Sequence, residues 1–120
     1  MKGLPLIIYG DGSQTRDFVY VEDVVDAILL ALSSDGSGIY NVGVGAPVSV
    51  NELARLILEL TASSSEIIYA PPRLGDISRS YADISSIIRD LNFHPEVSLR
   101  CGLKRSLVEL KAEGGSSIPL

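Results

Sequence analysis

Two arginines follow short apolar segments of the chain, and each lies in a polar loop that could bind phosphate. Arg16 comes after the loop of residues 10–15 and is followed by Asp17 and an apolar run. A guanidinium can bind two phosphate oxygens at once, and a neighbouring carboxylate can hold its plane. The same residue types also form ordinary surface ion pairs, so Arg16 alone predicts either a phosphate contact or an ion pair.

The segment of residues 71–76, Pro-Pro-Arg-Leu-Gly-Asp, offers similar chemistry in a second loop. Its prolines stiffen the backbone and Gly75 permits a turn, so Arg73 and Asp76 could face one ligand. The arginine suits a phosphate group, whereas the aspartate accepts a hydrogen bond from a sugar hydroxyl. Two arginine loops in one small chain are a stronger indication of a ligand site than either loop alone.

A glycine pair in the middle of the chain resembles half of a dinucleotide-binding loop. Gly43 and Gly45 follow a strand-like segment and precede a helix-like one. The pattern is incomplete, because the third glycine position is Val48 and Pro47 interrupts the turn. No acidic residue is placed to bind a ribose, since Glu66 begins the next strand instead of ending it. These residues predict a tight turn rather than a pyrophosphate site.

Composition limits the remaining classes of function. The 120 residues are 46% apolar and 21% charged, which is enough to bury a core in one domain. A net charge of −5 argues against nonspecific nucleic-acid binding, and an apolar run of at most six residues argues against a membrane span. One cysteine, Cys101, and one histidine, His94, provide no disulfide and no zinc site. With no signal peptide visible, we expect a reducing, cytoplasmic compartment, and we expect His94 to be a solvated turn residue rather than a base.

Local patterns predict four strands and four helices. The strands are expected at residues 5–9, 16–21, 39–42 and 66–70, and the helices at residues 22–32, 49–60, 83–91 and 98–110. Ser49 and Glu52 have the spacing of a capping box, and Asp83 and Ser98 are expected to cap the last two helices. The order is β-β-α-β-α-β-α-α, which is typical of an α/β arrangement.

Residues 10–23, Gly-Asp-Gly-Ser-Gln-Thr-Arg-Asp-Phe-Val-Tyr-Val-Glu-Asp, resemble a motif of NAD-dependent nucleotide-sugar epimerases and dehydratases. These enzymes belong to the extended short-chain dehydrogenase/reductase superfamily, and their pattern is G-x-G-x-x-x-R-D-F-[VI]-[YH]-V-x-D. The likeness covers about residues 3–110 and continues through residues 40–43, 49–53, 73–76, 82–85 and 91–95. Three departures from the family pattern bear on the subfamily: Leu74 replaces a proline, Ser86-Ile87 replaces Lys-Ala, and Asn92 replaces a glycine.

The resemblance implies roles for five residues of this sequence. Arg16 corresponds to the family arginine that binds the diphosphate of a nucleoside-diphosphate sugar. Arg73 and Asp76 correspond to residues that reach the phosphate and the ribose. Ile7 and Tyr9 would be the wall residues beside the base, usually uracil, which agrees with apolar side chains on one face of a strand.

The resemblance also identifies what this sequence lacks. The family has an N-terminal Rossmann half with a glycine-rich NAD loop and a Tyr-x-x-x-Lys pair, and none of the five tyrosines here has a lysine four residues later. The expected fold is therefore α/β, a C-terminal substrate-binding subdomain at residues 1–112 with a flexible tail at 113–120. It would have no catalytic, cofactor-binding or metal-binding residue of its own. NAD and the N-terminal half would complete the enzyme, whose ligand is a UDP-sugar or a related nucleotide sugar.

Two other classes of function remain open from the sequence. The first is a stand-alone nucleotide-binding module that uses Arg16, Arg73 and Asp76 without catalysis; such a module should bind tightly, whereas half of an enzyme pocket should bind weakly. The second is a self-associating domain, because the helix expected at residues 24–32 is apolar nearly all round. Exposed apolar surface of that kind drives association into homo-oligomers.

Overall fold

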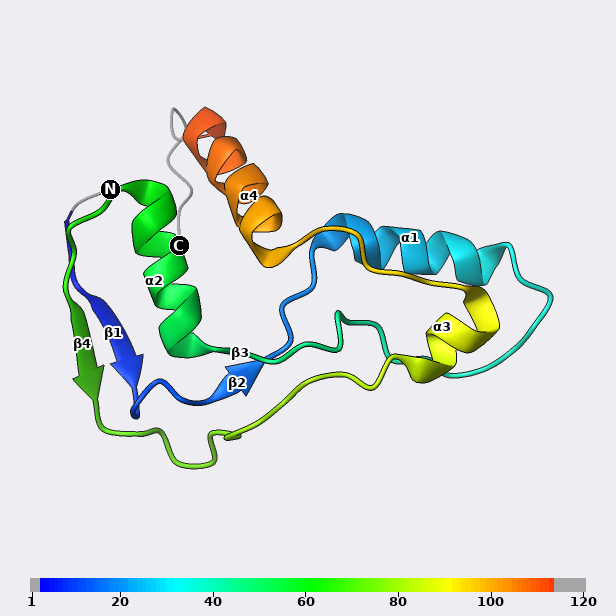
Figure 1. Cartoon of the computed structure of the whole chain (residues 1–120), viewed down its shortest axis with the longest axis horizontal. Coiled ribbons are helices and arrows are strands. Elements are labelled where there is room, and N and C mark those ends of the chain that lie inside the picture. Colours follow the sequence, from blue (N-terminus) through cyan, green and yellow to red (C-terminus); the bar gives the residue numbers. More distant parts are fainter. Residues whose placement is uncertain (1–2, 114–120) are drawn as a thin grey trace.

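The longest strands, β1 and β4, pair in parallel in this computed structural model, which describes residues 3–113 (Figure 1). β1, Leu6–Tyr9, and β4, Ile67–Ala70, are in register from the first residue of each to the last. Their β-branched and aromatic residues suit a pleated surface. Because side chains alternate along a strand, Ile8 is buried at 4% exposure while Ile7 and Tyr9 lie on the exposed face.

A shorter antiparallel pair joins β2, Thr15–Arg16, to β3, Val48–Ser49. The strand predicted at residues 16–21 is therefore limited to its start, and the strand predicted at residues 39–42 is not formed. The elements follow one another in the order β1-β2-α1-β3-α2-β4-α3-α4, and the third strand is a different segment from the one predicted. Apolar, β-branched sequence favours an extended backbone, whereas a strand also needs a hydrogen-bonded partner, and no described strand pairs with residues 39–42.

Four helices complete the described chain. They are α1, Val21–Leu32; α2, Val50–Thr61; α3, Ser85–Leu91; and α4, Leu99–Glu113. In Figure 1, α2 lies beside the β1–β4 sheet and α4 lies next to α2, whereas α1 and α3 lie together at the other end of the molecule. All four helices lie close to their predicted positions, because the helical pattern is local to each segment.

The predicted helix caps are confirmed at two of three positions. Ser49 Oγ accepts a hydrogen bond from the amide of Glu52 at 3.2 Å, and the Glu52 carboxylate accepts one from the amide of Ser49 at 2.9 Å, which completes the capping box. Ser98 Oγ accepts from an amide in the first turn of α4. The Asp83 prediction is wrong by one position: the N-cap of α3 is Ile84, and the Asp83 carboxylate accepts from the backbone two residues further on.

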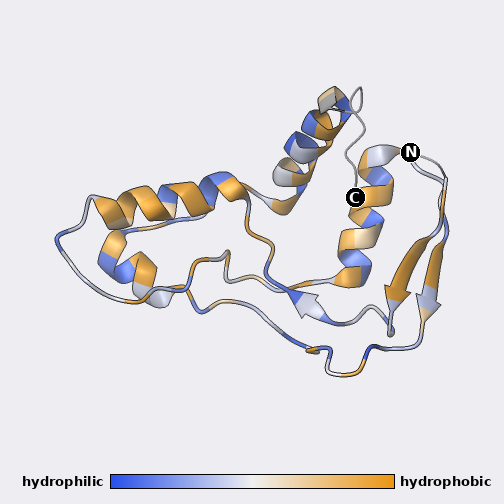
Figure 2. Cartoon of the chain, turned by 180° about the vertical axis from the view of Figure 1, so that it is seen from behind, coloured by the Kyte–Doolittle hydropathy of each residue, from blue (hydrophilic) through white to orange (hydrophobic). Residues whose placement is uncertain are grey.

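Apolar side chains gather in separate small groups instead of one core. Ala27, Ile87 and Phe93 form a buried cluster at α1 and α3, and the buried residues Ile8 and Ala54 do not belong to it. The radius of gyration is 17.1 Å, against about 14 Å expected for a compact chain of this length. Apolar residues also lie along the surface of α1, as Figure 2 shows. The described residues therefore leave an extended apolar surface uncovered.

The described chain ends with α4, which includes Glu113, the first residue of the predicted tail. Residues 114–120, the rest of that tail, lie outside the described residues. Among the described helices, none has the length and hydropathy needed to cross a membrane.

Candidate functional site

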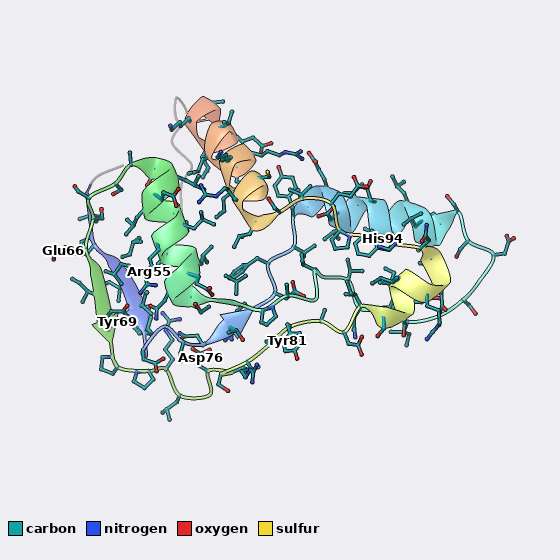
Figure 3. All side chains as sticks on the ribbon, in the orientation of Figure 1. Arg55, Glu66, Tyr69, Asp76, Tyr81 and His94 are labelled. Carbon is teal, nitrogen blue, oxygen red and sulfur yellow. The ribbon has the colours of Figure 1, made fainter. Side chains whose placement is uncertain are left out.

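The main cleft of the described structure opens where β1 and β4 end, and we call it the strand-end cleft. Its volume is about 760 Å³, within the range of small-molecule sites. Its lining comes from the ends of the two strands and the loops after them: Tyr9, Gly10, Asp11, Ser13, Gln14, Tyr69, Ala70, Pro72, Arg73, Asp76, Ile77 and Ser78. Figure 3 labels Tyr69 and Asp76, which lie on this part of the molecule. Ligands of open α/β sheets bind at the carboxyl ends of parallel strands, which is the position of this cleft.

Four of the five predicted site residues line this cleft or the hollow beside it. Tyr9, Arg73 and Asp76 line both, and Ile7 lines the neighbouring hollow together with Val50. The parallel pairing of β1 and β4 explains this convergence, because it brings the loop after residue 9 next to the loop after residue 70. The sequence-based grouping of Ile7, Tyr9, Arg73 and Asp76 thus corresponds to one region of the structure.

The fifth residue, Arg16, does not line the cleft, but it is hydrogen-bonded to two residues of its rim, Asp76 and Ile77. Its guanidinium donates to the Asp76 carboxylate at 2.7 Å and to the carbonyl oxygens of Thr15 and Ile77 at 2.7 and 2.6 Å. The Arg16 and Asp76 side chains are 32% and 36% exposed, so the pair is partly open to solvent. Arg16 therefore fixes the loop that carries Asp76 and partly neutralises the Asp76 carboxylate.

Asp17 is not the partner of Arg16, which corrects the sequence-based prediction. Its carboxylate accepts hydrogen bonds from the amides of Val44 at 3.0 Å, Gly45 at 2.9 Å and Ala82 at 3.1 Å. These amides come from two segments far along the chain, so their contact with Asp17 could not be read from local sequence. Asp17 thus joins the end of β2 to the turn at residues 43–45.

This use of the turn bears on NAD. A pyrophosphate at Gly43–Val44–Gly45 would need the free amides of Val44 and Gly45, and both donate to the Asp17 carboxylate. An anion there would also face a carboxylate of the same charge. The residues present therefore do not fit the pyrophosphate of NAD. Among residues 3–113, no three His, Cys, Asp or Glu side chains are grouped as a metal site would require.

Arg73 stacks on Tyr9. Its guanidinium carbon lies 4.0 Å from the centre of the Tyr9 ring, a close cation–π contact. A planar guanidinium on an aromatic face keeps donors free at its edge, so Arg73 can stack and still bind an anion. The contact also means that Arg73 covers one face of the Tyr9 ring, the side chain that we expected to contact the base.

The sequence did not single out three other residues of this region. Gln14 donates to the Tyr9 carbonyl at 2.8 Å and Tyr69 lines the cleft, while Asn51 lies behind the loop that follows β1. The Asp11 carboxylate accepts from the hydroxyl and the amide of Ser13, and these bonds lower the pKa of Asp11 below its usual value. Gln14 and Asn51 lie in segments that carry the family likeness, but their roles were not predicted, because the contacts that define them form only in the fold.

The fold is an α/β arrangement with a cleft at the carboxyl ends of two parallel strands. A solved UDP-glucose 4-epimerase of Thermotoga maritima with UDP-glucose matches it with a TM-score of 0.88 at 39% identity, over 92% of this chain and 36% of that one. A Bacillus cereus UDP-glucuronic acid 4-epimerase in complex with UDP-glucuronic acid and NAD matches with a TM-score of 0.84 at 29% identity, over 92% and 36%.

Sequence comparison agrees with the structural match. The NAD dependent epimerase/dehydratase family matches residues 1–43. A putative UDP-glucose 4-epimerase of Methanocaldococcus jannaschii is 45% identical over 88% of this chain and 34% of its own length. A UDP-glucuronic acid decarboxylase of Arabidopsis thaliana is 35% identical over 89% of this chain and 25% of its own. Over nearly its whole length the chain resembles members of the NAD dependent epimerase/dehydratase family, and it spans a quarter to about a third of the length of these relatives.

Proposed function

We propose that this chain binds the nucleoside-diphosphate part of a UDP-sugar for an NAD-dependent nucleotide-sugar epimerase. The observation that carries the proposal is the convergence of Tyr9, Arg73 and Asp76 on one cleft, with Arg16 bonded to Asp76. The cleft thus combines an aromatic ring, the Arg73 guanidinium and the Asp76 carboxylate, and the Arg16 guanidinium lies next to it, bonded to Asp76. This is the donor and acceptor set that a base, a diphosphate and a ribose require.

Each residue would have a distinct role in binding. Arg73 and Arg16 would supply positive charge to the diphosphate, and the Asp76 oxygen that does not bond Arg16 would accept from a ribose hydroxyl. Binding of the diphosphate would draw Arg73 away from the ring of Tyr9. The freed face of Tyr9, together with Ile7 on the same side of β1, would then contact the uracil.

In the whole enzyme, the role of this chain would be to orient the sugar. Fixing the nucleotide converts the reaction of the sugar into a step within one complex, which is a large part of catalysis. NAD and the Tyr-x-x-x-Lys pair would come from an N-terminal Rossmann half. The relatives named putative UDP-glucose 4-epimerase and UDP-glucose 4-epimerase favour that activity over decarboxylation, because they are 45% and 41% identical to this chain, against 35% and 37% for two UDP-sugar decarboxylases.

The second candidate function is association through α1. Large apolar side chains on this helix are exposed, among them Val25, Ile28, Leu29 and Leu32. In the proposed enzyme this surface would be covered by the N-terminal half, whereas in a self-associating domain it would be covered by a second copy. Size-exclusion chromatography with light scattering separates these alternatives: a monomer over a wide concentration range excludes self-association.

Calorimetric titration of the chain with UDP, UDP-glucose and NAD tests the proposed binding. We expect weak binding of UDP and UDP-glucose, no binding of NAD, and loss of UDP binding in Arg73→Ala. Arg89→Ala is the matched control, because Arg89 pairs with the adjacent Asp90 on α3, which lies at the other end of the molecule (Figure 1). Equal UDP affinity in Arg73→Ala and Arg89→Ala would refute the assignment of the cleft.

A further inference from the structure

The side chain of Asn51 connects the two walls of the strand-end cleft. Its Nδ2 donates to the carbonyl oxygen of Asp11 at 2.9 Å, in the loop after β1. Its Oδ1 accepts from the hydroxyl of Tyr69 at 2.9 Å, near the end of β4. Both polar atoms of one amide are therefore used, one for each wall.

The backbone around Asn51 strengthens this connection. The amide of Asn51 donates to the carbonyl of Gly12 at 3.0 Å, and the amide of Val50 donates to the carbonyl of Gln14 at 3.0 Å. The first turn of α2 thus uses two of its free amides to hold the loop of residues 10–14. Asn51 itself does not line the cleft or the neighbouring hollow.

Gly12 leaves room for the side chain of Asn51 because it has no Cβ. Its φ is +75°, in the left-handed region that favours glycine, and a Cβ at this position would overlap the Asn51 side-chain amide. The loop therefore passes so close to α2 that only glycine leaves room for the asparagine. Packing this tight makes the position of the loop depend on the side chain at residue 51.

We infer that Asn51 is a positioning residue for nucleotide binding, which sets the separation between the loop of residues 10–14 and Tyr69. This inference rests on the proposed function of the cleft. The base would contact Tyr9, which leads into the loop that Asn51 holds and accepts a hydrogen bond from Gln14 of that loop, whereas the phosphates would bind Arg16 and Arg73, to which Asn51 makes no hydrogen bond. Loss of the Asn51 side chain should consequently weaken the binding of a ligand that carries a base and leave the binding of a bare diphosphate unchanged.

The test compares UDP with inorganic pyrophosphate in Asn51→Leu, which keeps the size of the side chain and removes both hydrogen bonds. We expect the dissociation constant of UDP to rise about three- to tenfold and that of pyrophosphate to change by less than about twofold. Tyr69→Phe, which removes one of the two bonds, should give a smaller rise for UDP. Thr61→Val is the matched control, because it removes a hydroxyl that bonds the Ile57 carbonyl at the far end of the same helix.

Two results would overturn the inference. Unchanged UDP affinity in Asn51→Leu would show that the position of the cleft walls does not depend on Asn51. An equal loss of affinity for UDP and for pyrophosphate would show a general loss of structure. If the wild-type chain bound no UDP, the proposed function would fail, and amide hydrogen exchange of residues 12–14 would decide the positioning role. Faster exchange in Asn51→Leu than in Thr61→Val supports that role, and equal exchange overturns it.

Discussion

Removing the Arg16 side chain tests how the rim of the cleft is held. Arg16→Ala breaks three hydrogen bonds, one to the Asp76 carboxylate and two to the carbonyls of Thr15 and Ile77. Bonds of this kind contribute about 0.5–1.5 kcal/mol each, and a third of the Arg16 side chain is exposed, so water replaces part of what is lost. We expect the free energy of unfolding to fall by about 1–2 kcal/mol.

Urea denaturation at low and high salt measures this change. Arg89→Ala is the control, because the Arg89 side chain is 69% exposed and pairs only with its neighbour Asp90, so its loss should cost less than about 0.5 kcal/mol. The difference between Arg16→Ala and wild type should shrink at about 0.5 M salt, since screening weakens the contribution of Asp76 but not that of the two carbonyls. Equal stability of Arg16→Ala and Arg89→Ala would refute the view that Arg16 holds the rim.

Two further substitutions test hydrogen bonds that stabilise the fold. Asp23 is 1% exposed, and its carboxylate accepts hydrogen bonds from the amides of Glu96 and Val97. Asp23→Ala leaves these two amides without partners, so it should lower the free energy of unfolding, measured by urea denaturation, by about 2–4 kcal/mol. A smaller loss than that of Arg16→Ala would contradict this expectation. Hydrogen bonds from the amide and the hydroxyl of Ser49 lower the pKa of the Glu52 carboxyl. The stability that the Glu52 carboxylate contributes is therefore present above its unfolded pKa of about 4.3, and it is lost as pH falls through the lower pKa of the folded state. Glu52→Gln should therefore lose less stability than wild type between about pH 5 and 3, and parallel curves would contradict the capping box.

Helices and their caps could be predicted from sequence because they depend on nearby residues. The capping box of Ser49 and Glu52 involves residues three apart, and the apolar period of each helix lies within the helix itself. Whether residues 39–42 form a strand could not be predicted from nearby residues. Its sequence favours an extended chain, but pairing depends on a partner strand that local sequence does not specify.

The candidate site shows the same division between local and distant information. Residue types alone indicated Arg16, Arg73 and Asp76, because guanidinium and carboxylate groups in loops have recognisable chemistry. The bond between Arg16 and Asp76 joins residues 60 apart, so sequence adjacency wrongly favoured Asp17 as the partner. Asn51 lies in a segment that carries the family likeness, but its residue type predicts no particular chemistry, because its contacts with Asp11 and Tyr69 form only in the fold.

A nuclear magnetic resonance titration of the chain with UDP and with NAD, following amide shifts residue by residue, would test whether the strand-end cleft binds the nucleotide. We expect UDP-dependent shifts in residues 9–14 and 69–78, where the cleft lies, and none in residues 43–48. NAD should cause no saturable shifts, because Asp17 uses the amides of the glycine turn. Saturable shifts at residues 43–48 with NAD, and none at the cleft with UDP, would contradict the account.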